Sequence, residues 1–296
     1  MSIRMIMIYR MSGNEGMDKP RVAILGARGM LGSDVAEIFR QQEFNISAYD
    51  LPEFDITNVE HLSNALEHID VVINCAAYTN VEKAEQETER AFKINADAVK
   101  YLGQIAKDYG IWVLHISTDF VFDGKSEKPY TEKDNPNPIN AYGKSKLKGE
   151  QLLLETKCPL CILRVEWTYG LNGDNFVKKI IKRAETDEKI KVVDDQIGSP
   201  TATSEAAKVI LKLVSKQPVG IFHFAAAGYT TRHDCARFIL KKMNLPISIE
   251  PCRTDDFETL ADRPLNSCFN CSKIQRLLNL NIKPWQEPLE LFLKQL

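Results

Sequence analysis

Residues 22–32 read Val22-Ala23-Ile24-Leu25-Gly26-Ala27-Arg28-Gly29-Met30-Leu31-Gly32, an apolar run that leads into the spacing G-x-x-G-x-x-G. The run predicts a buried strand, and the apolar positions that follow predict an amphipathic helix. Glycines at such a junction allow a tight turn, close approach of the backbone to a pyrophosphate, and close packing of helix on strand. We therefore predict a dinucleotide site at Gly26, Gly29 and Gly32, rather than a turn with only a structural role.

The residues beside this loop leave the choice of cofactor open. The next expected strand, residues 46–49, ends at Asp50, where a carboxylate can accept a hydrogen bond from a ribose 2′-hydroxyl. That position favours NADH, although Asp50 could also be a turn residue before Pro52. Arg28 inside the loop could instead bind a 2′-phosphate, which favours NADPH. The expected cofactor is therefore NADPH or NADH.

The first half of the chain alternates between strand and helix patterns. Apolar runs with β-branched residues lie at residues 71–73, 111–116 and 160–165. Between them, apolar residues recur at helical spacing, as at Val99, Leu102, Ala106 and Tyr109. This order predicts an α/β fold with a doubly wound parallel sheet of the Rossmann type.

The alternation loosens after about Gly170. Here we expect helices near residues 175–183, 204–215, 233–243 and 288–293, and short strands near residues 190–193 and 221–224. We therefore predict that residues 21–170 mainly form the dinucleotide-binding domain and residues 171–296 mainly form a smaller α/β substrate lobe. The chain is expected to cross between these lobes, and residues 1–20 are expected to form an irregular leader.

Charge and hydropathy exclude several classes of partner. The 296 residues carry 38 Lys and Arg against 40 Asp and Glu, so neither nucleic acid nor a membrane surface is an expected partner. No apolar run approaches the ~20 residues that span a bilayer, and the start of the sequence does not read as a signal peptide. We therefore expect a cytoplasmic protein.

The cysteines and histidines do not predict a metal site. Seven cysteines are an odd number, which fits a reducing compartment. Two Cys-x-x-Cys pairs, at residues 158–161 and 268–271, could be halves of a zinc site, but they lie farther apart than zinc ribbons allow. The five histidines are scattered without metal-ligand spacing. We therefore expect thiols and no metal ligands.

A tyrosine and a lysine predict a proton donor. Asn140 is a suitable N-cap for a helix that carries Tyr142 and Lys146 four residues apart on one face. A phenol has an ordinary pKa near ~10, and an adjacent ammonium would lower that pKa by stabilising the phenolate. The lysine could also bind the nicotinamide ribose. Without supporting motifs, the same pair would be an ordinary solvated helix face.

A third polar residue comes at the end of an expected strand. Ser117-Thr118-Asp119 follows the run at residues 111–116. Ligands bind at the C-terminal ends of strands in doubly wound sheets, so Thr118 is placed to hydrogen-bond a substrate oxygen. Thr118, Tyr142 and Lys146 would then meet the dinucleotide in one crevice. We predict a nicotinamide-dependent reductase in which Tyr142 gives a proton to a carbonyl substrate.

Several further motifs resemble a single family. They are Asp55-Ile56-Thr57, Asn74-Cys75-Ala76-Ala77-Tyr78-Thr79 with Val81-Glu82-Lys83-Ala84-Glu85, Ser117-Thr118-Asp119-Phe120-Val121-Phe122-Asp123-Gly124, Arg164 with Trp167-Thr168-Tyr169-Gly170, Asp195-Gln196 with Gly198-Ser199-Pro200-Thr201, and Arg263-Pro264 with Ser267. With these motifs the chain resembles the extended short-chain dehydrogenase/reductase superfamily, and within it the dTDP-4-dehydrorhamnose reductases. The likeness runs from about Arg21 almost to the C-terminus. It implies reduction of the 4-keto group of dTDP-4-dehydro-L-rhamnose to dTDP-L-rhamnose.

The resemblance also implies roles for individual residues. The expected cofactor contacts are Gly29, Met30 and Leu31 at the pyrophosphate, Asp55 and Ile56 at the adenine, and Ala76, Ala77 and Tyr78 at the next strand end. The expected contacts to the sugar nucleotide are Thr118, Asp119, Phe120, Trp167, Gln196 and Arg263, with Tyr142 protonating O4. Some relatives are homodimers that hold Mg²⁺ between chains, but no acidic cluster in this sequence identifies ligands for that ion.

Two positions depart from the family pattern. Phe120 stands where a tyrosine is usual, which removes a hydroxyl beside the sugar. Glu166 stands where a small residue is usual, just before Trp167. A carboxylate near a diphosphate sugar is unfavourable unless it points away or meets a cation. The identity of the sugar is therefore less well defined than the type of reaction.

Two other functions stay open. One is a non-catalytic binding partner, since the regulatory β subunit of methionine adenosyltransferase resembles the same family. The presence of Thr118, Tyr142 and Lys146 argues against that function. The other is a sugar-nucleotide epimerase or dehydratase, which would keep its cofactor bound throughout turnover. Asp119-Phe120 supplies only one of the two acidic residues that a dehydratase would have.

Overall fold

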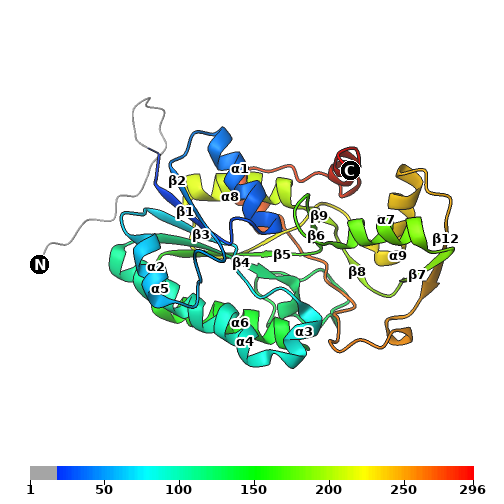
Figure 1. Cartoon of the computed structure of the whole chain (residues 1–296), viewed down its shortest axis with the longest axis horizontal. Coiled ribbons are helices and arrows are strands. Elements are labelled where there is room, and N and C mark those ends of the chain that lie inside the picture. Colours follow the sequence, from blue (N-terminus) through cyan, green and yellow to red (C-terminus); the bar gives the residue numbers. More distant parts are fainter. Residues whose placement is uncertain (1–18) are drawn as a thin grey trace, which may run out of the picture.

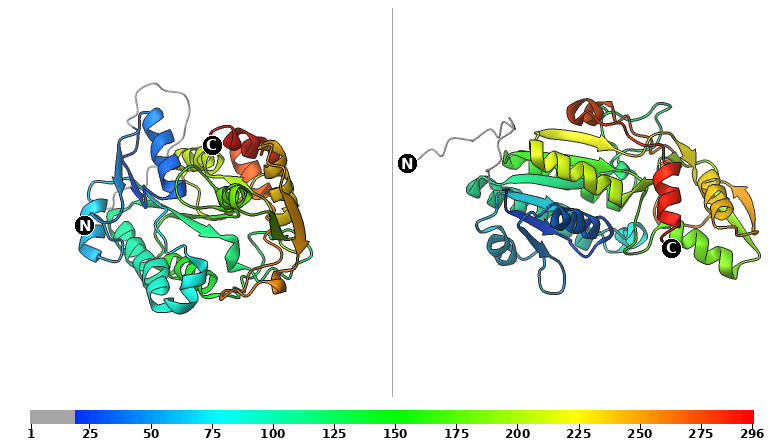
Figure 2. Two further views of the ribbon diagram at one scale, coloured as in Figure 1. Left: turned by 45° about the vertical axis from the view of Figure 1, so that its right-hand side comes forward. Right: turned by 90° about the horizontal axis from the view of Figure 1, so that it is seen from above.

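The structure, a computed structural model, describes residues 19–296 (Figure 1). A six-stranded parallel sheet with helices on both faces forms one lobe. A smaller lobe of helices and short strands lies beside it in every view (Figure 2). The prediction of an α/β fold with a doubly wound sheet is confirmed. Residues 1–18 of the predicted leader lie outside the described residues.

The large sheet has the strand order β10-β5-β4-β3-β1-β2, and its neighbouring strands are parallel. Its strands are β1 (Val22–Leu25), β2 (Ile46–Tyr49), β3 (Val71–Asn74), β4 (Trp112–Thr118), β5 (Leu160–Val165) and β10 (Gly220–Phe224). Strand β1 is buried on both faces, because Val22 and Ile24 face one core while Ala23 and Leu25 face the other. Two-sided burial explains why such strands read as continuous apolar runs.

Helices cover both faces of this sheet. Helices α1 (Met30–Gln41) and α8 (Thr203–Lys216) share one core with it. Helices α2 (Val59–Leu66), α5 (Ala98–Tyr109) and α6 (Ala141–Thr156) lie on the opposite face. The connection from β3 to α5 consists of α3 (Val81–Gln86), α4 (Thr88–Phe92) and a π-helical turn, η1 (Lys93–Asp97).

The smaller lobe has its own apolar core around Ile190, Ile239 and Trp285. It contains α7 (Phe176–Thr186), the parallel pair β7 (Lys189–Val193) and β12 (Ser248–Cys252), α9 (Arg232–Lys242) and α11 (Gln286–Leu293). Short pairs join β6 (Thr168–Tyr169) to β9 (Thr201–Ala202) and β8 (Ile197–Gly198) to β11 (Thr230–Thr231). Two 3₁₀ turns, η2 (Asp119–Val121) and η3 (Thr254–Asp256), and helix α10 (Ser272–Leu278) complete the elements.

The chain passes between the lobes more than once. After β9 it returns to the large sheet through α8 and β10, and α9 then lies in the smaller lobe. The helices expected in this half of the chain correspond to α7, α8, α9 and α11, whereas the strand expected near residues 221–224 is an edge of the large sheet. The division of the two lobes at residue 170 stays a prediction. Along residues 19–296, no helix is both long and apolar enough to cross a membrane.

Candidate active site

The glycine loop joins β1 to α1 at the C-terminal end of the sheet. Gly26 has a φ of +75°, and a Cβ there would lie 2.6 Å from the backbone nitrogen of Ala76. A Cβ on Gly32 would lie 2.0 Å from the Gly26 carbonyl oxygen. Both positions therefore require glycine. Among the described residues, no side chain caps α1 at Gly29, so backbone N–H groups of its first turn can bind an anion.

The side chains of the first two residues of α1, Met30 and Leu31, face the smaller lobe and the core, respectively. The Met30 Sδ atom lies 3.8 Å from Asn175 Nδ2 at the start of α7, so this side chain faces the smaller lobe. Leu31 packs against the core under α1 and α8. Their predicted contact with a pyrophosphate would therefore come from the backbone rather than from the side chains.

Asp50 and Arg28 form one cluster beside the loop. Asp50 accepts hydrogen bonds from the backbone N–H groups of Arg28 at 2.7 Å and of Leu51 at 2.8 Å. The Arg28 guanidinium donates to the Leu51 carbonyl and pairs with Glu53 at 2.9 Å. A ribose would meet the Asp50 carboxylate, and a 2′-phosphate would compete with Glu53 for the guanidinium. The geometry thus keeps both NADH and NADPH as expected cofactors.

Asp55 and Ile56 follow β2 at the same edge of the sheet. Asp55 Oδ1 accepts from the backbone N–H of Thr57 at 2.8 Å, which closes a turn before α2. Asn58 rather than Asp55 caps that helix. Ile56 is only 6% exposed, so it presents little of its side chain to an adenine.

A buried asparagine fixes the loop after β3. The predicted cofactor contacts Ala76, Ala77 and Tyr78 lie in this loop. Asn95, in the π-helical turn η1, accepts from the Tyr78 N–H at 2.8 Å and donates to the Tyr78 carbonyl at 3.1 Å. It also donates to Ser145 Oγ of α6 at 2.9 Å. The loop is therefore tied to the helix that carries Tyr142. Asn95 was not predicted, because an isolated asparagine inside a helical stretch has no distinguishing pattern.

Helix α6 begins as predicted and carries the two expected catalytic side chains. The Asn140 side chain accepts from the Gly143 N–H at 2.8 Å, so Asn140 is the N-cap. Lys146 is only 2% exposed, and its Nζ donates to the Ile116 carbonyl at 2.8 Å and lies 3.3 Å from His115 Nε2. Burial lowers the pKa of Lys146 to about 8. The helix therefore brings Lys146 to the C-terminal half of β4.

The expected lowering of the Tyr142 pKa is wrong. Burial raises the pKa of Tyr142 to about 12, although a hydrogen bond with Thr118 acts in the opposite direction. The Lys146 ammonium is directed at the Ile116 carbonyl and the His115 ring, which lie on β4, and not at the phenol. Spacing along a helix predicts a shared face, but it does not predict which of several acceptors a long side chain will reach.

Thr118 and Asp119 lie together at the end of β4. The Thr118 hydroxyl donates to Asp119 Oδ1 at 3.0 Å, and Ser267 Oγ donates to Asp119 Oδ2 at 2.5 Å. Burial raises the pKa of Asp119 from its ordinary value, although both hydroxyl groups favour the charged form. The Phe120 ring meets the Tyr142 ring edge to face, with centroids 5.5 Å apart. Four side chains from two segments of the chain therefore meet beside Tyr142, the predicted proton donor.

A cleft of about 340 Å³ lies next to this group, between the large sheet and the smaller lobe. Four of the six predicted substrate contacts line it: Phe120, Trp167, Gln196 and Arg263. Thr118 and Asp119 do not line it, but they adjoin it through Phe120 and Ser267. Gln196 Nε2 donates to Oγ1 of Thr254, another residue that lines the cleft, at 3.1 Å. The structure thus brings the predicted substrate residues to one place.

Two cations in this cleft were not predicted. The Arg232 guanidinium lies 3.5 Å from the centroid of a Trp167 ring and 4.8 Å from that of Phe176. Burial lowers the pKa of Arg232 to about 10. Lys179 of α7 lines the same cleft, so Lys179, Arg232 and Arg263 surround it with positive charge. No sequence pattern distinguishes Arg232, which follows the ordinary N-cap Thr231 of α9.

Glu166 lies behind the cleft and not in it. The side chain is fully buried, and within the described part of the chain neither carboxyl oxygen has a partner at full hydrogen-bond geometry. Burial and the nearby Asp119 raise its pKa well above the ordinary range, while the backbone N–H groups of Ser199 and Phe269, and Arg232, act in the opposite direction. Of the two arrangements that make a carboxyl tolerable here, the first is met because Glu166 does not line the cleft, and Arg232 also supplies the cation of the second.

Arg164, another motif residue, also has a structural role. Its guanidinium binds both carboxylate oxygens of Glu150, at 2.9 and 2.6 Å, and both side chains are 2% exposed. This pair joins β5 to α6, and Arg164 does not line the cleft. It therefore supports the helix that carries Tyr142 without reaching a ligand.

No metal centre emerges from residues 19–296, which contain no group of three or more His, Cys, Asp or Glu side chains suited to a metal. The seven cysteines are all free thiols, including those of the two Cys-x-x-Cys pairs. The expectation that these pairs are thiols rather than a zinc site stays a prediction.

Comparison with known proteins identifies the family. Residues 20–296 match the family described as RmlD substrate binding domain. The chain is 36% identical over 286 residues to dTDP-4-dehydrorhamnose reductase of Aggregatibacter actinomycetemcomitans, which covers 91% of this chain and 97% of that protein. It is 35% identical over 239 residues to dTDP-4-keto-6-deoxy-D-glucose reductase of Streptomyces niveus, which covers 79% of this chain and 83% of that protein.

A solved structure gives the same result. The crystal structure of dTDP-4-dehydrorhamnose reductase from Bacillus anthracis in complex with NADP is 36% identical, with a TM-score of 0.90, and covers 94% of this chain and 100% of that chain. The chain therefore belongs to the dTDP-4-dehydrorhamnose reductase family of the extended short-chain dehydrogenase/reductase superfamily, and it is an oxidoreductase of that kind.

Proposed function

We propose that this chain reduces the 4-keto group of dTDP-4-dehydro-L-rhamnose to give dTDP-L-rhamnose, with NADPH or NADH as the hydride donor. The observation that carries the proposal is the position of Thr118, Tyr142 and Lys146. These residues meet at the C-terminal half of β4, next to the positively charged cleft, and the glycine loop lies at the same C-terminal end of the sheet. Such a reaction is a step in the synthesis of a deoxysugar nucleotide. We place it in the cytoplasm, where seven free thiols are stable.

The C-terminal edge of the sheet fits a nicotinamide dinucleotide. Gly26 and Gly32 leave a cradle that a Cβ on either residue would fill. The first turn of α1 offers N–H groups to the pyrophosphate, and Asp50 or Arg28 would meet the adenosine ribose. When bound, the dinucleotide supplies a hydride to C4 of the sugar.

Tyr142 acts as the proton donor. Because burial holds the pKa of Tyr142 at about 12, the phenol is protonated at neutral pH, as an acid must be before it protonates a forming alkoxide. The Thr118 hydroxyl, which donates to Asp119 in the structure, would turn its proton to the same carbonyl oxygen and stabilise its developing charge. Lys146, with a pKa of about 8, is mostly charged at pH 7 and would bind the nicotinamide ribose.

The cleft fits a sugar joined to a diphosphate. Stacking on Trp167 fixes the plane of the Arg232 guanidinium and leaves N–H groups at its edge for phosphate oxygens. Lys179 and Arg263 add charge on the two sides of the cleft. Two relatives carry the names of dTDP-4-keto sugar reductases, which supports this class of substrate. The choice of rhamnose within the class rests on the motifs that include Trp167 and Arg263.

A coupled assay tests the proposal. Purified protein is given dTDP-4-dehydro-L-rhamnose or dTDP-4-keto-6-deoxy-D-glucose, each with NADPH and with NADH, and the loss of nicotinamide absorbance is followed. The Tyr142→Phe variant is expected to lose at least about 100-fold in kcat, because it keeps the ring but lacks the proton. Tyr101→Phe, at an exposed position on α5, is the matched control. Substantial turnover by the Tyr142→Phe variant would refute the proton-donor role.

The same assay separates the two competing functions. An epimerase or dehydratase would be isolated with stoichiometric NAD and would show no net consumption of reduced cofactor. A regulatory subunit would show no turnover with either sugar but would bind a partner enzyme. Free exchange of cofactor together with consumption of NADPH or NADH is the result we expect.

A further inference from the structure

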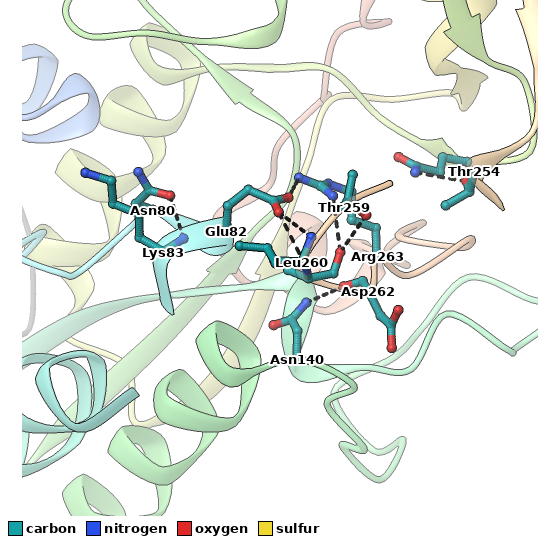
Figure 3. Close-up of polar contacts among 11 residues, drawn as sticks. Asn80, Glu82, Lys83, Asn140, Thr254, Thr259, Leu260, Asp262 and Arg263 are labelled. Carbon is teal, nitrogen blue, oxygen red and sulfur yellow. Dashed lines mark hydrogen bonds and ion pairs between the residues drawn. The ribbon is translucent and has the colours of Figure 1, made fainter. Parts of the chain in front are cut away.

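One segment of the smaller lobe crosses to the nucleotide-binding lobe beside the cleft. We call residues 257–264, which follow η3, the substrate loop. Four of its residues line the cleft: Phe257, Thr259, Arg263 and Pro264. In Figure 3 this loop lies against Glu82 and Asn140, which belong to the first turn of α3 and the start of α6. One wall of the cleft therefore contacts α3 and α6, which belong to the lobe that contains the large sheet.

Glu82 holds three donors of this loop with one carboxylate. Its Oε2 accepts from the backbone N–H groups of Leu260 at 2.8 Å and of Ala261 at 3.3 Å. Its Oε1 pairs with the Arg263 guanidinium (Figure 3). Burial raises the pKa of Glu82, but the Arg263, Leu260 and Ala261 donors outweigh burial and hold that pKa below its ordinary value. The side chain is thus a charged acceptor shared by backbone and guanidinium.

A second contact fixes the same loop to α6. The Asn140 side chain donates to the Asp262 carbonyl at 2.7 Å through Nδ2 while its Oδ1 caps the helix at Gly143. The helix that presents Tyr142 and the loop that presents Arg263 are therefore joined through one side chain. Glu82 lies a few residues after Ala77 and Tyr78, the predicted cofactor contacts that precede α3.

Apolar packing holds this loop mainly through two small residues, Ala261 and Pro264, which are buried. Its two large apolar side chains are exposed, Phe257 at 41% and Leu260 at 60%. A partly exposed ion pair is worth little in stability, but two backbone N–H groups on the same carboxylate define a single loop conformation. The polar contacts of Glu82 and Asn140 therefore add to the packing of Ala261 and Pro264 and tie the loop to α3 and α6.

We propose that Glu82 is a positioning residue for the sugar nucleotide: it holds the substrate loop and the Arg263 guanidinium at the cleft without touching the substrate itself. The inference rests on the proposed function in one respect, that Arg263 faces the diphosphate. Arg263 uses Nη2 for Glu82 and Nη1 for the Ala261 carbonyl at 3.2 Å, which fixes the plane of the guanidinium. Its remaining N–H groups can bind phosphate oxygens.

Kinetics distinguish this role from a catalytic or a general structural one. In Glu82→Ala, the loop loses all three contacts, and we expect KM for the dTDP-sugar to rise about 10-fold or more while kcat stays within about threefold. The Kd for NADPH should not change. In Glu82→Gln, the amide oxygen still accepts from the two backbone N–H groups but lacks the charge that faces Arg263, so an intermediate KM is expected. Glu89→Gln, an exposed charge removal in α4, is the matched control.

Proteolysis and ligand binding test the loop without the reaction. Chymotrypsin should cut after Phe257 or Leu260 faster in Glu82→Ala than in the wild type or in Glu89→Gln, and calorimetry should show weaker binding of dTDP to Glu82→Ala. Equal cleavage and equal dTDP affinity in the three proteins would overturn the role of Glu82, as would a fall in kcat at unchanged KM. If the wild type binds dTDP but reduces neither sugar, the proposed function fails while the positioning role is still measured.

Discussion

At the scale of the single residue, Glu166 is the most unusual side chain of the site. A fully buried carboxyl whose oxygens make no hydrogen bond of full geometry disfavours ionisation, so its pKa in the folded state lies above that in the unfolded chain. The unfolded chain releases this proton as pH rises past about 4.5, while the folded protein retains it. The contribution of Glu166 to stability is therefore complete below that pH and is lost progressively above it.

The Glu166→Gln variant should accordingly become more stable relative to wild type as pH rises from 5 to 8. Urea denaturation at both pH values measures the difference in free energy of unfolding. Glu155→Gln, an exposed change on α6, supplies the control. If the difference between Glu166→Gln and wild type is the same at pH 5 and pH 8, Glu166 does not titrate in the way that its burial requires.

Individual residues also show where sequence reasoning reaches its limit. The spacing of Tyr142 and Lys146 and the cap at Asn140 were predicted correctly, because caps and i, i+4 faces are local properties. The partners of Lys146 were not predicted, because Ile116 and His115 belong to β4, an element that only the fold brings to α6. Arg232 was missed for the same reason, since its stacking on Trp167 joins residues that only the tertiary fold brings together.

At the scale of the element, the contact between α6 and the π-helical turn η1 is a sensitive point. A Cβ on Gly149 of α6 would lie 2.0 Å from the Asn95 carbonyl oxygen. Gly149→Ala must therefore displace α6, which carries Tyr142 and Lys146, or the turn that holds the Tyr78 loop. We expect a loss of stability of about 1–3 kcal/mol and a fall in kcat of about 10-fold or more.

Thermal unfolding and steady-state kinetics check this expectation together. Lys148→Ala, an exposed change one residue earlier on the same helix, should alter neither quantity appreciably. Gly149→Ala protein with wild-type kcat and stability would mean that the helix and the turn can separate without cost, contrary to the close backbone contact.

Elements were predicted in proportion to the strength of their pattern. Strands β1, β3, β4 and β5 were anticipated because burial on both faces makes them continuous apolar runs. The two-residue strands β6, β8, β9 and β11 have no periodicity, and β12 is only partly buried. The π-helical turn was missed because it differs from an α-helix by a shift of one residue in hydrogen bonding, which leaves the apolar pattern nearly unchanged.

At the scale of the whole molecule, two buried histidines determine how the fold responds to acid. Burial, together with Lys146 for His115 and Arg164 for His223, lowers both pKa values, that of His223 to about 3. Both rings stay neutral in the folded protein, whereas the unfolded chain binds a proton at each below about pH 6.5. The contribution of the two histidines to stability is therefore complete above that pH and is lost as pH falls, by up to about 1.4 kcal/mol per pH unit for each, which exceeds the opposite dependence of the single Glu166.

Urea denaturation at pH 7.5, 6.5 and 5.5 should show this loss. In His223→Gln the dependence on pH should be shallower by one proton, whereas His68→Asn, at an exposed position, should keep the wild-type dependence. If the wild-type protein has the same free energy of unfolding at pH 7.5 and at pH 5.5, the two buried histidines do not dominate the pH dependence of stability in this range.

The position of β10 has a consequence for the order of synthesis. Five strands of the large sheet are complete once residue 165 has been made, but the edge of β5 receives its neighbour only when residues 220–224 emerge. At about 5–20 residues per second, a nascent chain keeps the apolar strand Leu160–Val165 bare on one side for several seconds. Ribosomal pausing between these two strands would prolong that interval. A chain released early would expose the unpaired backbone groups of β5, which can pair with another chain and aggregate.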